Sequence, residues 1–285
     1  MAIEQLSSNI ECIQWGGLGH LTADLLSERW QEPKMARTFI RVVETDRGLQ
    51  GYSDVYQVSD KLARFHGIAS DVEGAALLID WTYDETVSQG MTVQTSLVLK
   101  GEGRTLYAGI DDHPLSSLLA GKGFGPVSTT RVMRLLPEKN IRDRTLPPSY
   151  HMLDFKESRL SSLMATYFLA WPKDYYQNEN ADEIAEIFLQ ASPNDLRLVS
   201  SKAGDVVGYV LLSRTNEHGV IDEVAVHPTH RHKGLGEVLT QWAIDSLRDR
   251  IVTLVVMDEN PARYLYEKLG FVVWEERLDM LVAPR

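Results

Sequence analysis

Residues 230–236 read HRHKGLG and lie between a β-branched run, Val220–His227, and an amphipathic run from about Glu237 to Arg248. Glycines at positions 234 and 236 let the backbone turn tightly and leave no Cβ between its N–H groups and a ligand. The predicted helix begins at this loop, so its unpaired N–H groups and its positive dipole end point into it. This geometry binds a pyrophosphate group. The segment therefore predicts an anion-binding loop between a strand and a helix.

The loop alone leaves the ligand open. A single Gly-x-Gly after a strand is also common in ordinary turns. The third glycine and the distal acidic residue of a dinucleotide-binding fingerprint are absent, and no Gly-Lys-Ser/Thr follows, as a Walker loop requires.

The elements around the loop predict an α/β domain with a mixed sheet. Two β-branched runs flank Ala203-Gly204-Asp205, which is typical of a hairpin. The other expected elements are helices over Asp154–Ala170, Ala181–Leu189 and Ala262–Leu269, a strand over Ile251–Met257, and a last pair of strands around Phe271–Val282.

The first half of the chain repeats signatures of the second. Gly51-Tyr52 corresponds to Gly208-Tyr209, and Gly123-Phe124 corresponds to Gly270-Phe271. Met133 and Met280 follow their phenylalanines at the same offset, and the helical run Ala75–Gln89 stands where Glu237–Arg248 does. Matched signatures in matched order favour a tandem repeat of one fold. A proline-rich linker separates the copies, so we expect domains at 1–136 and 150–285 with a linker over 137–149.

Composition narrows the classes of protein. The 285 residues carry a net charge of −11, and no basic face suited to nucleic acid stands out. An acidic surface favours a cationic partner such as an amine. One cysteine, Cys12, excludes an internal disulfide, and neither a signal peptide nor an apolar run long enough for a membrane helix is recognisable. We expect a soluble, cytoplasmic protein without membrane, nucleic-acid or metal partners.

Two segments in order, Arg231-x-x-Gly-x-Gly236 after a strand ending at His227-Pro228 and then NPARYLYEKLGF over 260–271, resemble the GNAT superfamily of N-acetyltransferases. The resemblance covers Asp195–Val282 well and Tyr150–Asn194 loosely. It implies two tandem GNAT-like domains, each a mixed, mostly antiparallel sheet flanked by helices, in a layout that resembles mycothiol synthase. It also implies acetyl-CoA as cosubstrate and acetyl transfer to a primary amine of a small molecule or peptide, by direct attack in a ternary complex. The acceptor itself is not specified by these motifs.

The resemblance also implies roles for single residues. The loop from Arg231 wraps the pyrophosphate, and a bulged strand over Glu223–Val226 pairs with the pantetheine arm where two strands part. The expected cofactor-binding residues are Val224, Ala225, Val226, Arg231, His232, Lys233, Gly234, Leu235, Gly236, Glu237 and Asn260.

Tyr266 stands where many members of the family place a general acid. A phenol with a pKa of about 10 stays protonated at neutral pH and can protonate a departing thiolate. A core tyrosine on an amphipathic helix is the alternative. A carboxylate is also expected as base, and strand alternation lets only one of Asp222 and Glu223 face the cleft. We favour Glu223, with His227 and His230 as other conceivable bases.

The acceptor is expected near the connection between the first two helices of the C-terminal domain, at Trp171, Tyr175 and Tyr176. These aromatic residues could instead pack on the sheet.

The first half lacks the cofactor motifs. Aligned on its glycine, it has Ala69 opposite Arg231 and Val72 opposite Gly234, and Leu119 stands where Tyr266 does. We expect this half not to bind CoA productively. Two other functions remain open from sequence: a non-catalytic acyl-CoA-binding or sensing protein, and a scaffold that binds no CoA.

Overall fold

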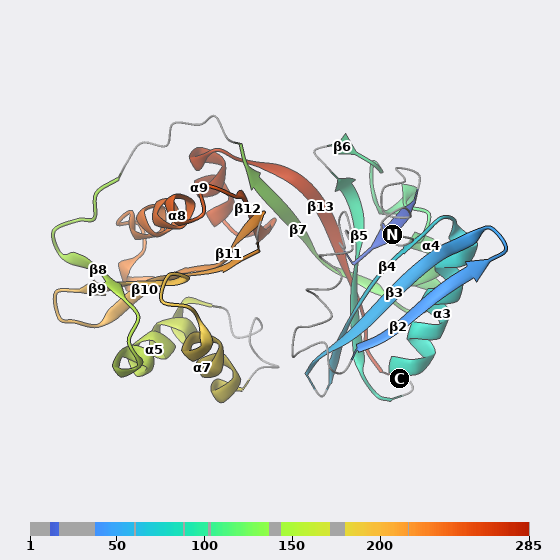
Figure 1. Cartoon of the computed structure of the whole chain (residues 1–285), viewed down its shortest axis with the longest axis horizontal. Coiled ribbons are helices and arrows are strands. Elements are labelled where there is room, and N and C mark those ends of the chain that lie inside the picture. Colours follow the sequence, from blue (N-terminus) through green and yellow to red (C-terminus); the bar gives the residue numbers. More distant parts are fainter. Residues whose placement is uncertain are drawn as a thin grey trace. The chain divides into compact units, whose positions relative to one another are not determined.

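The computed structural model of this chain describes residues 12–16, 38–59, 61–87, 89–101, 104–136, 144–171, 180–215 and 217–284 (Figure 1). The chain divides into two compact units. The first unit comprises Met1–Arg131 and Trp274–Arg285, and the second unit comprises Val132–Val273. No helix of the described ranges is long and apolar enough to cross a membrane.

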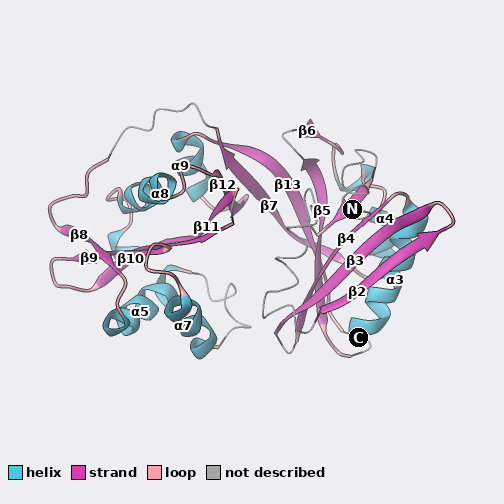
Figure 2. Ribbon diagram, in the orientation of Figure 1, coloured by secondary structure: helices cyan, strands magenta, loops and turns pink. Residues whose placement is uncertain are grey.

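The second unit is a sheet with helices on both faces (Figure 2). Its strand order is β7-β12-β11-β10-β9-β8. Its strands are β8 (Tyr150–Asp154), β9 (Leu196–Ser201), β10 (Val206–Arg214), β11 (His218–Val226) and β12 (Ile251–Met257). Of β7 (Gly125–Leu135), only the residues from Val132 onward belong to this unit, and the earlier ones belong to the first unit. The helices are α5 (Leu160–Ala170), α7 (Ala181–Gln190), α8 (Leu235–Ser246) and α9 (Ala262–Leu269), with short 3-10 turns η3 (Glu157–Arg159) and η4 (Pro228–His230).

Two apolar clusters fill the two faces of this sheet. Leu163 and Phe188, from α5 and α7, pack with Tyr209 on one face. Leu239 of α8 and Leu269 of α9 belong to the cluster on the other face. The predicted mixed α/β sheet is therefore confirmed, with its layers made by alternating strand residues.

The first unit has the strand order β2-β3-β4-β1-β5-β13-β7. Its strands are β1 (Ile13–Trp15), β2 (Thr38–Thr45), β3 (Gly48–Ser59), β4 (Leu62–Ala69), β5 (Thr92–Gly101), β6 (Arg104–Thr105) and most of β13 (Phe271–Val282). Helices α3 (Val72–Val87) and α4 (Ser116–Gly121) and the 3-10 turn η2 (Ile110–Asp112) complete it.

The register of the strands confirms the tandem repeat. Gly51 of β3 pairs with Ala69 of β4, as Gly208 of β10 pairs with Val226 of β11. In both units the next strand after the helix, β5 or β12, runs parallel to its partner. The two units therefore share their register from Gly51↔Ala69 to Asp54↔His66 and from Gly208↔Val226 to Leu211↔Glu223, where the bulge of β11 begins. By the matched Gly-Phe and Met signatures, β7 and β13 are equivalent strands.

Two sequence expectations were wrong in detail. The helix expected over Asp154–Ala170 begins only at Leu160, and strand β8 (Tyr150–Asp154) precedes it. Tyr150 and Met152 of β8 pack on one cluster and Leu153 on the other, the period of two of a strand. Phe271–Val282 is one strand, not a pair. The segment contains no glycine or proline to form a turn.

The equivalent strands β7 and β13 have residues in both units. Glu276–Val282, from the end of the chain, pairs with β5 of the first unit. Met280 accordingly packs in the core of the first unit, whereas Met133, from the first half of the sequence, packs in the core of the second. The compact units thus differ from the expected 1–136 and 150–285 domains, because each half contributes a strand to the other unit.

We expect Met133→Ala to destabilise the second unit although the residue comes from the first half. Met133 is fully buried, and truncating a buried methionine costs about 2–5 kcal/mol. Thermal unfolding should show a fall in Tm of several degrees. Val127→Ala on the same strand is the control, because Val127 is exposed and should change little. Equal Tm values for the two variants would contradict the burial of Met133.

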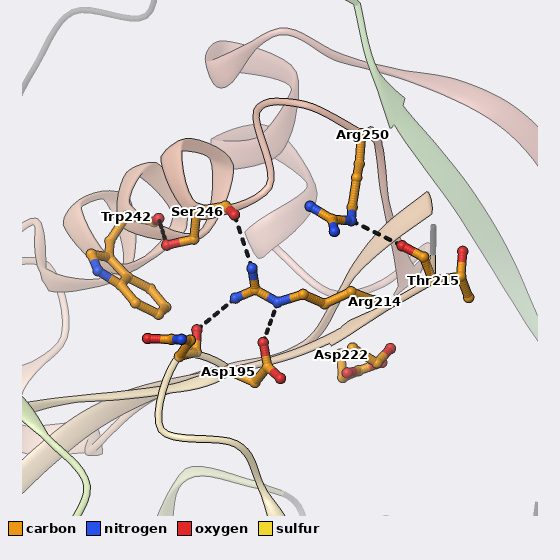
Figure 3. A network of polar contacts seen from close by, with 9 residues as sticks. Asp195, Arg214, Thr215, Asp222, Trp242, Ser246 and Arg250 are labelled. Atoms are coloured by element: carbon orange, nitrogen blue, oxygen red, sulfur yellow. Dashed lines mark hydrogen bonds and ion pairs between the residues drawn. The ribbon is translucent and has the colours of Figure 1, made fainter. Parts of the chain in front are cut away.

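A polar network fixes the C-terminal end of α8 (Figure 3). The Arg214 guanidinium forms an ion pair with Asp195 and donates to the carbonyl of Asn194 at 2.6 Å and to that of Ser246 at 3.1 Å. Arg250 donates to the Thr215 carbonyl at 2.9 Å. A cation at the last carbonyls of a helix complements its dipole. The network therefore holds α8 in place, with its opposite end at the predicted anion loop.

Candidate active site

Strands β11 and β12 part near the middle of β11. Their parallel register runs from His218↔Ile251 to Ile221↔Leu254, and no further pairing between them is found in the described residues of either strand. On its other side β11 contains a bulge, since Leu211 pairs with Glu223 but Leu212 pairs with Ile221. Asp222 is the extra residue. A bulge bends a strand and increases its twist, which separates it from a neighbour.

The two candidate carboxylates have different surroundings. Asp222 is exposed and accepts a hydrogen bond from Ser213 Oγ at 3.0 Å. Glu223 is half-buried on the face of α5 and α7, where it accepts a 2.5 Å hydrogen bond from the Tyr209 hydroxyl. Glu223 is thus the carboxylate held in a fixed position by a buried donor.

Trp171 is connected to this carboxylate through the same tyrosine. The Trp171 indole N–H donates to the Tyr209 hydroxyl at 3.0 Å, so the chain of hydrogen bonds runs from Trp171 through Tyr209 to Glu223. Burial, and then the charge of Glu223, raise the pKa of Tyr209 well above its ordinary value, which keeps the phenol a donor. The other two residues expected at the acceptor side, Tyr175 and Tyr176, lie outside the described residues.

The predicted anion loop connects β11 to α8. His232 has a φ of 61°, and Gly234, the N-cap of α8, has a φ of 82°. When residues in the left-handed conformation alternate with other residues, successive backbone N–H groups point to the same side of the chain. Such a group of N–H donors forms a concave site that binds an anion. Among the described residues, no acceptor is found for any backbone N–H of His232–Glu237. The run therefore presents consecutive free donors at the positive end of α8.

The side chains of the loop are held by backbone carbonyls. Arg231 donates to the carbonyls of Val226 at 3.1 Å and of Ala170 at 2.7 Å, and Lys233 donates to that of Thr229 at 3.2 Å. These contacts leave both cations exposed next to the free N–H groups.

The two histidines of the loop are engaged in local contacts. His230 Nδ1 lies 3.0 Å from the Tyr150 hydroxyl, and His227 Nδ1 accepts from the Thr229 N–H at 3.3 Å. Burial, and then the charge of Lys233, lower the pKa of His230. Neither imidazole is brought to Glu223 by these contacts.

Arg144 is a further cation at this end of α8. Its side chain pairs with Glu237, which also accepts from Lys268 at 2.8 Å, and its guanidinium lies where a Cβ on Gly234 would meet it at 2.6 Å. Burial alone would raise the pKa of Glu237, but the hydrogen bonds from Lys268 and Arg144 lower it. Arg144 and Lys268 together carry one more positive charge than Glu237 neutralises, so the net charge beside the free N–H groups is positive.

Tyr266 lies on α9 with its ring in the core of the second unit. The ring is 8% exposed and meets Phe271 edge-on, with centroids 6.0 Å apart. Burial raises the pKa of Tyr266 to about 12. Its hydroxyl donates to no described residue and is not among the unsatisfied polar atoms cut off from solvent. The phenol is therefore a protonated donor that still reaches solvent.

The remaining predicted cofactor residues have structural contacts as well. Asn260 Oδ1 accepts from the Ala262 N–H at 3.0 Å and so caps α9. Leu235 is buried in the core, and only its backbone faces the loop. Val224, Ala225 and Val226 pair with β10, and they continue along β11 beyond the point where β12 parts from it.

The first unit differs from the second at the loop. Because Ala69 is equivalent to Val226, the sequence alignment of Ala69 with Arg231 was wrong, as was that of Val72 with Gly234. Only Ser70 and Asp71 stand between β4 and α3, where His227–Gly234 stand in the second unit. The loop is missing rather than substituted.

The carboxylate of Asp71 caps α3. Its Oδ1 accepts from the Gly74 N–H at 2.7 Å, and its carbonyl accepts from the Ala75 N–H at 3.1 Å. A fixed negative charge thus occupies the place where an anion would bind in the second unit.

The second motif is degenerate in the same manner. His113 Nδ1 accepts from the Leu115 N–H at 3.2 Å, as Asn260 caps α9, and Leu119 is buried at the position of Tyr266. Burial lowers the pKa of His113 to about 4.

Sequence reasoning missed three residues of these sites. Tyr209 was visible as half of a repeated Gly-Tyr pair but carried no sign of its contact with Glu223. Arg144 belongs to the expected linker, and Asp71 becomes a cap only because the preceding loop is short. The role of each residue depends on how the chain folds around it, which the sequence pattern near that residue does not reveal.

The comparisons with known proteins agree with this geometry. Residues 160–271 match the acetyltransferase (GNAT) family. A mycothiol acetyltransferase of Arthrobacter sp. (strain FB24) is 25% identical over 246 residues, which cover 79% of this chain and 75% of that protein. The L-amino acid N-acyltransferase MnaT of Escherichia coli (strain K12) is 36% identical over 85 residues, 27% of this chain and 49% of that protein.

Solved structures extend the likeness of the fold to both units. A GCN5-related N-acetyltransferase from Sphaerobacter thermophilus has a TM-score of 0.77 at 16% identity, with 100% of this chain and 92% of that chain covered. A tandem GNAT protein from the clavulanic acid biosynthesis pathway has a TM-score of 0.62 at 13% identity, covering 92% and 87%. Residues 160–271 therefore match the acetyltransferase (GNAT) family, and the fold of the chain is that of tandem GNAT proteins.

Proposed function

We propose that the second unit transfers an acetyl group from acetyl-CoA to a primary amine in a ternary complex. The observation that carries this proposal is the run of free N–H groups over His232–Glu237, at the positive end of α8 and beside the parting of β11 and β12. Free N–H groups and a helix dipole suit a pyrophosphate. The edge of β11 beyond Ile221 suits the amide groups of a pantetheine arm, as an added strand would.

Acetyl-CoA supplies an activated thioester, and the residues of the second unit manage two protons. Glu223 accepts a proton from the incoming ammonium, directly or through a water molecule, which frees the amine lone pair to attack the carbonyl carbon. The carbon–nitrogen bond forms, the attached nitrogen releases its second proton to solvent, and the carbon–sulfur bond breaks. Tyr266 donates its hydroxyl proton to the departing thiolate. The phenol then regains a proton from solvent.

The acceptor we propose is a cationic amine of a small molecule or a peptide. Glu223 accepts from Tyr209, and Trp171 in turn donates to Tyr209, so a carboxylate lies near aromatic rings, which suits an ammonium group. Two relatives are named as N-acyltransferases, one of L-amino acids and one of an alanine of ribosomal protein bS18, which supports an amine as acceptor.

A screen tests this function directly. Amines, amino acids, aminoglycosides and peptide N-termini are incubated with the protein and acetyl-CoA, and release of the CoA thiol is measured. We expect acceptor-dependent release with at least one class. Binding of acetyl-CoA without release across the whole panel would instead indicate an acyl-CoA-binding or sensing protein.

We expect one molecule of acetyl-CoA to bind per chain. The loop with free N–H groups exists in the second unit, whereas the first unit has Asp71 in its place. Isothermal calorimetry should therefore give a stoichiometry of one. Two equivalent sites would contradict the assignment of the first unit as unable to bind CoA.

A further inference from the structure

The N-terminal strand β1 occupies an unusual place in the first unit. It lies between β4 and β5, with Ile13 opposite Ala69 and Trp15 opposite Gly67 in antiparallel register with β4. On its other side Trp15 pairs with Leu97, and the Gly16 N–H donates to the Ser96 carbonyl at 2.7 Å. Its counterpart in the second unit, β8, pairs with β9 at the edge of the sheet.

Strand β1 lies where β4 and β5 part, which is equivalent to the opening between β11 and β12 in the second unit; we call each of these openings a cleft. Strands β4 and β5 pair directly only from Leu62↔Thr92 to Arg64↔Gln94 and then part, as β11 and β12 do after Ile221↔Leu254. Through the shared register, Ala69 is equivalent to Val226 and Gly67 to Val224. Strand β1 thus runs along the same edge that we propose for the pantetheine arm.

The far end of β1 reaches the position of the candidate base. His66 pairs with Asp54 as Glu223 pairs with Leu211, so His66 is equivalent to Glu223. A Cβ on Gly16 would lie 2.4 Å from His66 Cδ2, which shows how closely the end of β1 approaches this side chain. Strand β1 therefore extends from Ala69, the equivalent of Val226 at the end of β11, to His66, the equivalent of Glu223.

The packing of β1 is specific to this cleft. Trp15 is fully buried, and its indole lies where a Cβ on Gly67 would come within 2.0 Å of it. Gly16 has a φ of 73°, a conformation that favours glycine. The second unit has valine at the position of Gly67, and so could not accept an indole there.

We propose that the first unit carries a peptide-binding cleft whose built-in ligand is strand β1, seated in the place of a pantetheine arm. Its ligand class is an extended peptide with a large aromatic side chain beside Gly67. This inference rests on the proposed function only for the identity of the second cleft. If the anion-binding loop of the second unit were inserted between β4 and α3, β1 would still fill the cleft. The absence of this loop is therefore not the only feature that would prevent the first unit from binding CoA.

Gly67→Val tests the seat of β1 in the intact chain. It copies the residue of the second unit, and its side chain would collide with the Trp15 indole. Hydrogen exchange followed by mass spectrometry should show at least a tenfold faster exchange for residues 12–16. Gly109→Ala is the control, because its φ is −170° and an added Cβ meets nothing within 4 Å. Unchanged protection of residues 12–16 in a folded Gly67→Val protein would overturn the proposal.

A crosslink keeps the proposal testable if Gly67→Val fails to fold. The register of β1 and β4, extended by one residue, sets Cys12 opposite Ser70. Directly opposed residues in an antiparallel pair have a Cα separation that a disulfide can span. Ser70→Cys should therefore form a disulfide with Cys12 on mild oxidation, seen as loss of both thiols, whereas the control Asp111→Cys should keep both.

Failure of the crosslink in a folded Ser70→Cys protein would contradict the placement of β1. The readouts concern the first unit alone and need no acetyl-CoA. A protein that forms the crosslink but binds no acetyl-CoA would refute the proposed function and leave this inference standing.

Discussion

The variant Gly236→Val should lose acetyl-CoA binding while its Tm stays close to that of the wild type. Its Cβ would lie 3.6 Å from Leu265 and 3.9 Å from Val226, ordinary contact distances, and its backbone needs no positive φ. The fold therefore tolerates the residue. The branched side chain would stand between β11 and α9, beside the free N–H groups of the loop.

Loss of two or three charge-assisted hydrogen bonds sets the size of this effect. At about 1.5–3 kcal/mol each, the affinity should fall by at least about 100-fold. Calorimetry with acetyl-CoA measures it, and thermal unfolding checks the fold. Gly125→Val serves as the control, since an added Cβ there meets nothing within 4 Å. Normal binding by a folded Gly236→Val protein would show that this loop does not hold the phosphates.

Much of the fold could be predicted because its signals are local. The Ala203-Gly204-Asp205 turn between two β-branched runs, with a φ of 92° at Gly204, and the helix Ala262–Leu269 followed by Gly270, depend on neighbouring residues alone. The exchange of β7 and β13 depends on pairing between distant segments. Nothing in the sequence near Met133 or Met280 distinguishes one core from the other, because both cores accept a methionine at the same place.

In the candidate site, too, the local features could be predicted from the sequence and the contacts between distant segments could not. The loop at 230–236 was recognisable because its glycines follow Arg231 after a strand and precede the segment over 260–271, whereas a Gly-x-Gly alone is common in ordinary turns. The hydrogen bonds of Glu223 with Tyr209, and of Glu237 with Arg144 and Lys268, join segments far apart in the chain. The sequence alignment of the two halves was wrong at the loop because the first half is shorter there, and matching residues by type does not reveal a deletion. The pairing of Gly51 with Ala69 shows which residues of the two units are equivalent.

The two units differ in what occupies the opening between their parted strands. In the second unit the strands part, the loop leaves its N–H groups free, and a buried phenol donates to a carboxylate. In the first unit the same opening is filled by β1, and Asp71 satisfies the N–H groups of α3. Groups of the chain itself therefore stand in the first unit where, in our proposal, the second unit holds acetyl-CoA.

Tyr266→Phe should leave acetyl-CoA binding nearly unchanged and lower turnover by about 10²–10⁴-fold, the range expected of a positioned general acid. Phenylalanine keeps the ring and its edge-on contact with Phe271, and removes only the hydroxyl. The cosubstrate is held mainly by backbone N–H groups in our proposal, so its affinity should not depend on that hydroxyl.

The pH dependence follows from the direction of the pKa shift. A general acid acts in its protonated form, so its contribution is lost as pH rises through its pKa. Burial raises the pKa of Tyr266 to about 12, so the phenol of the wild type should stay protonated and active well above pH 10. A fall in rate between pH 7 and 10 would therefore belong to another group, and it should persist in Tyr266→Phe.

The measurement uses the acceptor found by the screen and compares kcat and KM for acetyl-CoA in matched variants. Tyr264→Phe is the control, because Tyr264 lies on the same helix, is 63% exposed and accepts a hydrogen bond only from Arg263 among the described residues. It should keep normal turnover. If Tyr266→Phe also kept normal turnover, water or another group would protonate the thiolate, and Tyr266 would be a core residue of α9. A loss confined to kcat in Tyr266→Phe, with Tyr264→Phe unaffected, would instead identify the buried phenol as the proton donor.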